Sequence, residues 1–169
     1  MLETERLILL PLTYKQLLKY IKNDFSLDKE LQLTPTPRTI SADLLEALQL
    51  GILPNVADKR RNPLFYTLWT MILKSENCMV GDLCFKGKPN ERGEIEIGYG
   101  TYDAFQGKGY MTEAVGAMIK WAATQPSVKY ITAETEQENI ASFKVLEKNK
   151  FSKHLEVNNI FVWKRAVKD

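Results

Sequence analysis

The sequence has little of what metal centres, disulfide-bonded scaffolds and membrane segments need. Among its 169 residues there are two cysteines, Cys78 and Cys84, and one histidine, His154. So few ligands argue against a zinc site, and two cysteines argue against a disulfide framework. The apolar run in the N-terminal stretch MLETERLILLPLT is too short for a signal peptide or a membrane span. We therefore expect a cytoplasmic protein that holds no metal ion and does not enter a membrane.

The sequence also lacks an excess of charge of either sign. Its 23 lysines and arginines against 21 aspartates and glutamates give a formal net charge of +2, which provides no strong attraction to nucleic acid. A hydrophobic content of 44% is ordinary for a globular protein, and the length suits one domain spanning residues 1–169. No heptad pattern or apolar stripe indicates an oligomeric state, so a monomer and a homodimer both stay open.

The apolar periodicity predicts a mixed α/β (α+β) fold of about seven strands and four helices. The expected order is strand 4–12, helices 13–24 and 41–51, strands 64–74, 78–87 and 94–101, a helix from 110, strand 128–135, helix 139–149, and strands 151–157 and 160–167. Thr13 and Ser41 are expected N-caps, and Gly51 is expected to end the second helix before a polar loop.

Two consequences follow for the sheet. The three successive central strands should be antiparallel, whereas the strand–helix–strand unit from 94 to 135 should be parallel with a right-handed crossover. That unit places the turn after Thr101 at the carboxyl end of a strand, where open α/β sheets bind ligands.

This turn lies in the stretch FQGKGYMTEA, residues 105–114, directly before the helix. A helix start presents unpaired N–H groups and a positive dipole end, and glycine lets that backbone approach a phosphate closely. A plain glycine-rich turn is the alternative. The spacing fits neither the nucleotide-hydrolase loop nor the dinucleotide fingerprint, because Gly107-Lys108-Gly109 is followed by Tyr110 and Thr112 stands where a third glycine is needed.

The pattern Gln/Arg-x-x-Gly-x-Gly/Ala fits better: Gln106 and Gly109 match its first two defined positions, and Met111 stands at the third. Together with the strings EIEIGYGTYDAFQGKGYMTEAV and ENIASFKVLEKNKF, it resembles the GNAT superfamily of N-acetyltransferases, and most of all the branch of ribosomal-protein N-terminal acetyltransferases. The resemblance covers nearly the whole chain in element order and is specific over residues 94–151. It implies a single GNAT-like domain that moves the acetyl group of acetyl-CoA to a primary amine by direct attack.

The resemblance also implies which residues bind acetyl-CoA. Its pyrophosphate would lie on the main chain of the loop and helix start, which is Gln106, Gly107, Lys108, Gly109, Tyr110, Met111 and Thr112. The pantetheine arm would run beside Tyr99, Gly100 and Thr101, where a β-bulge at Gly98 or Gly100 would open a slot. Asn139, a predicted N-cap, would also contact this arm, and Ser142 would lie near the sulfur.

For catalysis, Glu96 is the preferred general base. Glu94, Glu134 and Glu136 are the other candidates, and for each of these carboxylates a purely solvated strand position is the alternative. Strand alternation places Glu94 and Glu96 on one face and the intervening isoleucines on the other. Ser142 or water would protonate the leaving sulfur, because many family members have a tyrosine where this sequence has Leu146.

The sequence departs from the family pattern at two further positions. Met111 replaces a small residue of the motif, and Lys150 replaces a glycine, so we expect Asn149 to take the left-handed cap conformation instead. The departures leave a non-catalytic acyl-CoA-binding or sensing module as an alternative, with a Mg²⁺-dependent nucleotide-binding domain as a third. The sequence does not identify the amine: ribosomal or other protein N-termini, polyamines and antibiotic-like amines stay open. The segment 31–40 is expected near the acceptor.

Overall fold

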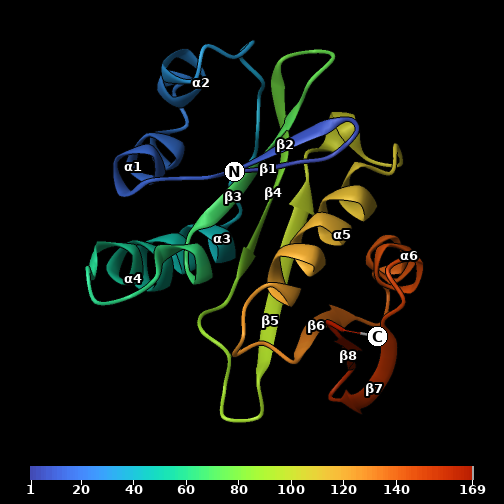
Figure 1. Cartoon of the computed structure of the whole chain (residues 1–169). Coiled ribbons are helices and arrows are strands. Elements are labelled where there is room, and N and C mark those ends of the chain that lie inside the picture. Colours follow the sequence, from blue (N-terminus) through green and yellow to red (C-terminus); the bar gives the residue numbers. More distant parts are fainter. Residues whose placement is uncertain (169) are drawn as a thin grey trace.

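The computed structural model describes residues 1–168, which form one mixed sheet with helices on both of its faces (Figure 1). The eight strands of this range are β1 (Leu2–Glu3), β2 (Leu7–Pro11), β3 (Leu68–Leu73), β4 (Cys78–Phe85), β5 (Glu94–Thr101), β6 (Tyr130–Glu136), β7 (Ser152–Val157) and β8 (Ile160–Ala166). Their spatial order is β1-β2-β3-β4-β5-β6-β8-β7, and every neighbouring pair except β5–β6 is antiparallel. The expected mixed, mostly antiparallel sheet is confirmed.

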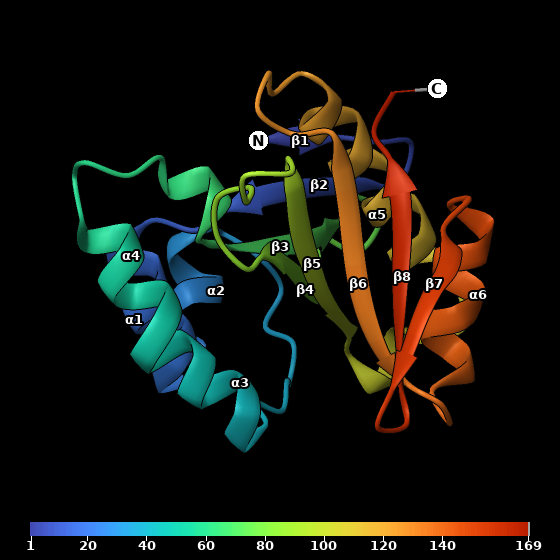
Figure 2. The same ribbon diagram turned by 90° about the horizontal axis from the view of Figure 1, so that it is seen from below.

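The helices within residues 1–168 are α1 (Tyr14–Lys22), α2 (Ser26–Glu30), α3 (Ala42–Glu46), α4 (Leu53–Ala57), α5 (Tyr110–Ala123) and α6 (Ile140–Lys148). A π-helical segment η1 (Ala47–Ile52) joins α3 to α4, and short 3₁₀ turns form η2 (Pro63–Phe65) and η3 (Asp103–Phe105). Figure 2 shows α5 and α6 on one side of the sheet and α1 to α4 on the other. Over the part of the chain described, no helix is long and apolar enough to cross a membrane.

Some element boundaries differ from the prediction. The helix expected to end at Gly51 continues through η1 and α4 to Ala57, so part of the expected polar loop is helical. Pro54 lies in the first turn of α4, next to the wider π-helical turn, where a missing N–H costs least. The first predicted strand, 4–12, is shorter in the structure, where β2 covers Leu7–Pro11, and the two-residue strand β1 precedes it. The short helix α2 lies in a stretch for which no element was predicted.

Two hydrophobic clusters hold the layers together. In one, the apolar face of α5 packs on the sheet; its buried members Met111, Ala114, Val115, Met118, Ile119 and Ala122 are the residues that helical spacing selects. In the other, Leu17 and Tyr20 of α1 meet Leu68, Ile72 and Met79 from the opposite face of the sheet. Each strand in the middle of the sheet therefore buries residues on both faces, which fixes its register.

The parallel pair β5–β6 separates halfway along. These strands pair only at Glu94–Tyr130, Ile95–Ile131 and Glu96–Thr132, while β6 stays paired with β8 from Tyr130 to Glu136. The expected bulge at Gly98 or Gly100 is absent from the β4–β5 ladder, whose register is regular from Ile97 to Thr101. Past Glu96, β6 therefore runs alongside β8 and moves away from β5. Beyond Glu96, the edge of β5 that faces β6 therefore has no neighbouring strand.

Candidate active site

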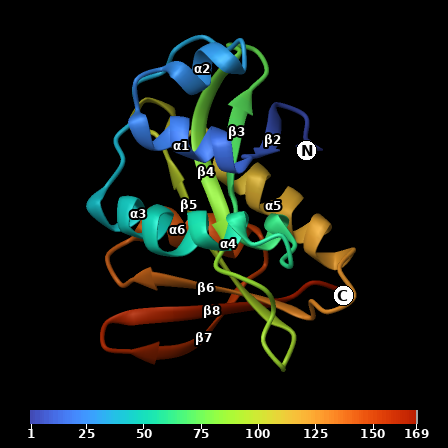
Figure 3. The same cartoon turned by 90° about the vertical axis from the view of Figure 1, so that its left-hand side faces the viewer.

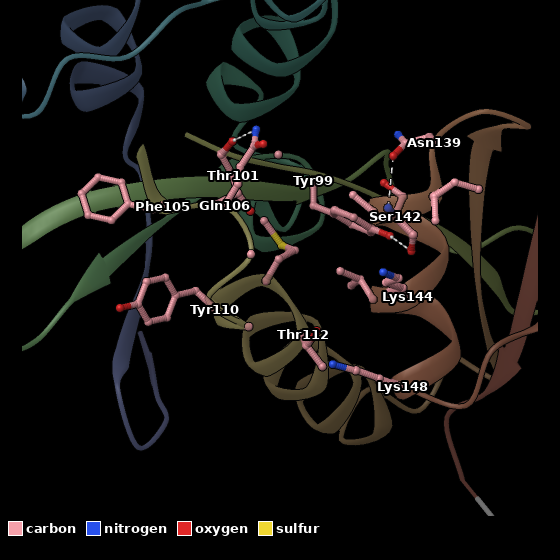
Figure 4. A pocket seen from close by; sticks show the side chains of 17 residues that line it. Tyr99, Thr101, Phe105, Gln106, Tyr110, Thr112, Asn139, Ser142, Lys144 and Lys148 are labelled. Carbon is pink, nitrogen blue, oxygen red and sulfur yellow. Dashed lines mark hydrogen bonds between the residues drawn. The ribbon is translucent and has the colours of Figure 1, made fainter. Parts of the chain in front are cut away.

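A cavity of about 810 Å³ lies where β5, the glycine-containing loop and α6 meet (Figure 4). Its lining contains every predicted cofactor-binding residue except Lys108, namely Tyr99, Gly100, Thr101, Gln106, Gly107, Gly109, Tyr110, Met111, Thr112, Asn139 and Ser142. Phe105, Ile140, Ala141, Lys144, Val145 and Lys148 complete it and were not predicted. Three separate segments of the sequence thus form one hollow on the α5 and α6 side of the sheet.

The loop before α5 presents its main chain to this cavity. Gly107 (φ +74°) and Gly109 (φ +79°) both adopt the left-handed conformation that favours glycine. The Gln106 side chain donates to the Asp103 carboxylate (3.2 Å), which fixes the start of the loop. Gly109 is the N-cap of α5 and offers no side-chain acceptor, so the first N–H groups of this helix lack a cap. An uncapped helix start of this kind suits an anion.

Across the cavity, the first turn of α6 is capped as predicted. The Asn139 side chain accepts a hydrogen bond from the backbone N–H of Ser142 (3.1 Å). The Tyr99 side chain reaches from β5 toward this turn, where its hydroxyl donates to the Ser142 carbonyl (3.3 Å), as Figure 4 shows. Burial raises the pKa of Tyr99 to about 12, so this hydroxyl is a neutral hydrogen-bond donor.

Lys144 and Lys148 supply positive charge on the α6 side of the cavity (Figure 4). They are four residues apart and so lie on one face of the helix. The four-residue spacing is visible in the sequence, but the sequence does not show that this face of the helix borders the cavity. Lys108 is not part of the lining; its ammonium group lies 5.2 Å from the centroid of the Phe105 ring. Its cofactor role stays a prediction.

The end of α6 differs from the expectation. Lys150 itself, and not Asn149, takes the left-handed conformation (φ +61°), so the position tolerates lysine in place of glycine. The bonds from Lys150 N to Glu147 O and from Phe151 N to Leu146 O form the usual C-terminal motif. The Asn149 side chain instead donates to the Thr112 carbonyl (3.0 Å), which ties α6 to the start of α5.

Leu146 is fully buried in the core and does not line the cavity. The candidate carboxylates lie elsewhere. Glu96 is on the face of β5 opposite Ile95 and Ile97 and forms an ion pair with Lys86, while Glu94 pairs with Lys164 (2.6 Å). Burial of Lys86 opposes its charge, but the pair with Glu96 outweighs this and raises the pKa of the ammonium group. The structure does not bring Glu96 and Ser142 into one cavity.

The comparisons with known proteins agree with this geometry. The chain matches the acetyltransferase (GNAT) domain family over residues 6–152. It is 33% identical over 148 residues to an uncharacterized N-acetyltransferase, YjdG, of Bacillus subtilis, an alignment that covers 88% of this chain and 87% of the relative.

Solved structures share the fold at lower identity. The ribosomal-protein-S5-alanine acetyltransferase from Vibrio fischeri superimposes with a TM-score of 0.68 at 19% identity, covering 99% of this chain and 96% of the other. The aminoglycoside acetyltransferase AAC(6')-Ib in complex with coenzyme A gives 0.64 at 19% identity, with 95% and 94% covered. The family match and the close relative together show that the chain belongs to the GNAT family and is an acyl-CoA-dependent N-acetyltransferase.

Proposed function

We propose that this protein transfers the acetyl group of acetyl-CoA to a primary amine, either a protein N-terminus or a small-molecule amine, with both substrates bound together. The observation that carries the proposal is the cavity between the uncapped start of α5 and the lysines of α6. Its donors are main-chain N–H groups and ammonium groups, which is the set that a pyrophosphate and a phosphate need. When bound, acetyl-CoA would supply the activated acetyl thioester.

The separated edge of β5 supports a place for the pantetheine arm. Beyond Glu96, the N–H and C=O groups of β5 that face β6 lack a strand partner, so an extended amide chain can pair with them. An N–H group of this edge, in the stretch Tyr99–Thr101, would also polarise the thioester carbonyl. Asn139 and Ser142, at the other side of the slot, would hold the arm and the sulfur.

The hydroxyl groups near the slot favour a hydrogen-bonding role over full proton transfer. A thiol titrates near ~8.5, whereas burial raises the pKa of Tyr99 to about 12. Moving the Tyr99 proton to the leaving sulfur would therefore be uphill. We assign Ser142, with water, to the stabilisation of that sulfur, a role that Leu146 cannot take from inside the core.

The amine would approach from the other face of β5, on which Glu96 lies. An α-amino group titrates near ~8 and a lysine-type amine near ~10.4, so an α-amino acceptor needs less help from a base. Lys86 pairs with Oε1 of Glu96, so Oε2 would be the atom that accepts the proton. We therefore expect α-amino acceptors to react faster than lysine-type amines. The free cysteines, Cys78 and Cys84, are compatible with the cytoplasmic location we propose.

Binding is tested first. Thermal melting is measured with CoA, acetyl-CoA and ATP. Both CoA compounds should raise the melting temperature, because ligand binding stabilises the native state by mass action, and ATP should leave it unchanged. Thiol release should then require an amine, tested with an α-amino peptide, lysine, a polyamine and an aminoglycoside. Absence of any CoA effect would contradict the proposal. Binding without turnover on any amine would favour the acyl-CoA-binding module.

The roles of the side chains are tested separately. If Glu96 is the base, Glu96→Gln should lower kcat by roughly 10²–10⁴. Glu94→Gln, on the same face and also in an ion pair, is the matched control and should leave kcat unchanged. Ser142→Ala should lower kcat by about tenfold, the equivalent of one hydrogen bond, without changing the KM for the amine.

A further inference from the structure

Arg6, in the turn before β2, holds the glycine-containing loop from outside the cavity. Its backbone N–H donates to Oε1 of Glu113 (2.9 Å), and its Nε donates to Oε2 of the same carboxylate (2.6 Å). Its Nη1 donates to the carbonyl oxygen of Lys108 (3.0 Å), and its guanidinium lies 4.8 Å from the centroid of the Tyr110 ring. One residue thus contacts the loop and the first turn of α5, 102 to 107 residues away in the sequence.

The bond to Lys108 determines where the next N–H points. The carbonyl of Lys108 and the N–H of Gly109 belong to one trans peptide unit, in which the two groups point in opposite directions. Lys108 is outside the cavity lining, and Gly109 is part of it. Arg6 holds the carbonyl on its own side, so the Gly109 N–H points away from Arg6, and Gly109 is a residue that borders the cavity.

The loop needs such an external contact because its own residues constrain it little. Gly107 and Gly109 both have positive φ, and glycine has the largest backbone freedom of any residue. No side chain caps α5 at Gly109. Without Arg6, the peptide between Lys108 and Gly109 could rotate and present its carbonyl oxygen, which would repel a phosphate.

The contact works through geometry more than through charge. Arg6 is already neutralised by Glu113, in a pair whose side chains are 42% and 19% exposed. A neutral pair adds little attraction for a phosphate on the far side of the loop. The guanidinium bonds the carboxylate through Nε and the carbonyl through Nη1, two donors held in one rigid plane, whereas a lysine would have to reach both acceptors from one flexible ammonium group.

We propose that Arg6 is a positioning residue for acetyl-CoA: it fixes the peptide Lys108–Gly109 so that the loop is ready to bind the pyrophosphate. This inference rests on the proposed function, because it assumes that the cavity binds CoA. It predicts that the loss of Arg6 affects ligands that carry the pyrophosphate and spares ligands that lack it.

The test compares two acetyl donors, acetyl-CoA and acetyl-pantetheine, which has the thioester arm without the pyrophosphate. Arg6→Met should raise the Kd for CoA and the KM for acetyl-CoA by about tenfold, as expected for one charge-assisted hydrogen bond. The kcat/KM with acetyl-pantetheine should not change. Arg6→Lys keeps the charge and should show nearly the same loss.

Lys74→Met is the matched control. The Lys74 side chain pairs with Glu3 (3.3 Å) and donates to the Thr4 carbonyl (2.7 Å), both of which lie outside the loop. Loss of the Lys74 ammonium group should leave the kinetic constants with acetyl-CoA and with acetyl-pantetheine unchanged. Wild-type CoA affinity in Arg6→Lys, or an equal loss of kcat/KM with both donors in Arg6→Met, would overturn this inference and leave the proposed function standing. If the wild-type protein does not bind CoA, the proposed function fails and this inference fails with it.

Discussion

The two faces of β5 are built in different ways. On the face toward α5 and α6, Ile95 and Ile97 are buried, and the strand ends beside the cavity that the loop before α5 and the helix α6 also line. On the face toward α1 to α4, Gly98 and Gly100 lack side chains, and Asp82 of β4 lies directly opposite Gly100. Figure 3 shows α3 and α4 in front of this second face.

The second face depends on buried polar side chains that come from distant segments. Tyr20 of α1 and Tyr102 after β5 both donate to Oδ2 of Asp82, at 2.6 Å and 2.9 Å. The guanidinium of Arg38 lies 4.8 Å from the centroid of the Tyr20 ring and donates to Asp28 (3.1 Å), with both side chains of that ion pair fully buried. This cluster joins α1, α2 and the segment 34–40 to β4 and β5.

The comparison separates two kinds of substitution. On the face with the cavity, a change to a side chain that lines it should affect ligand affinity and leave stability nearly intact. Where buried side chains form the structure, a change should cost stability, because each partner left behind is buried without a hydrogen bond. The predictions below test that separation, in order of decreasing effect.

The largest effect is expected for Asp82→Ala. It leaves the hydroxyls of Tyr20 and Tyr102 without their acceptor in a buried site, so the free energy of unfolding should fall by about 2–5 kcal/mol. Urea unfolding measures this, and the CoA affinity of the folded protein should be unchanged. Glu134→Ala, an exposed carboxylate, is the control and should stay within about 0.5 kcal/mol. A loss below about 1 kcal/mol for Asp82→Ala would contradict the structural role.

The next effect is a dependence of stability on pH. Burial raises the pKa of Asp82 from 3.8 to about 6, although hydrogen bonds from Tyr20 and Tyr102 act to lower it. The folded state therefore holds the proton more tightly than the unfolded state, so this group's contribution to stability is complete below about pH 4 and is lost as pH rises through about 6. The loss is about 3 kcal/mol at most.

Asp82→Asn should remove this dependence, so its stability relative to wild type should improve between pH 4.5 and pH 7.5. Unfolding curves of both proteins at the two pH values measure the difference. Glu94→Gln provides the opposite sign: the hydrogen bond from Lys164 lowers the pKa of Glu94 below its ordinary value of 4.5. Its contribution to stability is therefore present above that pH and is lost as pH falls below it, so this variant should lose stability at pH 7.5 and approach wild type only below pH 4.5. Parallel pH curves for wild type and Asp82→Asn would show that Asp82 titrates normally.

The same contrast explains what could be predicted from the sequence. The loop before α5 was predictable because Gly107, Gly109 and the helix start after them are visible in the sequence. The assignment of Gln106 to Thr112 to the cofactor came from the resemblance to the GNAT superfamily and stays a prediction. The strand alternation of β5 and the apolar face of α5 were predictable because they follow local periods. The cluster around Asp82 was not, because Tyr20, Arg38 and Asp82 come together only when three layers pack. Lys144 and Lys148 were missed for the same reason.

Gly81 and Gly100 test the contrast across one pair of strands. A Cβ atom at Gly81 would lie 2.6 Å from the Gly100 carbonyl oxygen, whereas one at Gly100 would meet nothing within 4 Å. Gly81→Ala should therefore force β4 and β5 apart and cost about 1–3 kcal/mol. Gly100→Ala should change the free energy of unfolding by no more than about 0.5 kcal/mol. Its methyl group would point to the second face, so this variant should raise the KM for the amine and leave the Kd for CoA unchanged. Equal stability losses in the two variants would show that the faces are not independent.

The smallest effect concerns single lysines around the cavity. Lys148 lines the cavity, and Lys108 lies outside it against the Phe105 ring. Lys148→Ala should weaken CoA binding about two- to fivefold at low salt, the usual size of one exposed charge interaction, and the difference should shrink at high salt. Lys108→Ala should not change the Kd, measured by calorimetry. If it weakens binding as much as Lys148→Ala does, side chains of the loop, and not only its backbone, bind the phosphate. The cavity beside β5 would then bind its ligand through side chains as well as through the main chain of Gly107 and Gly109.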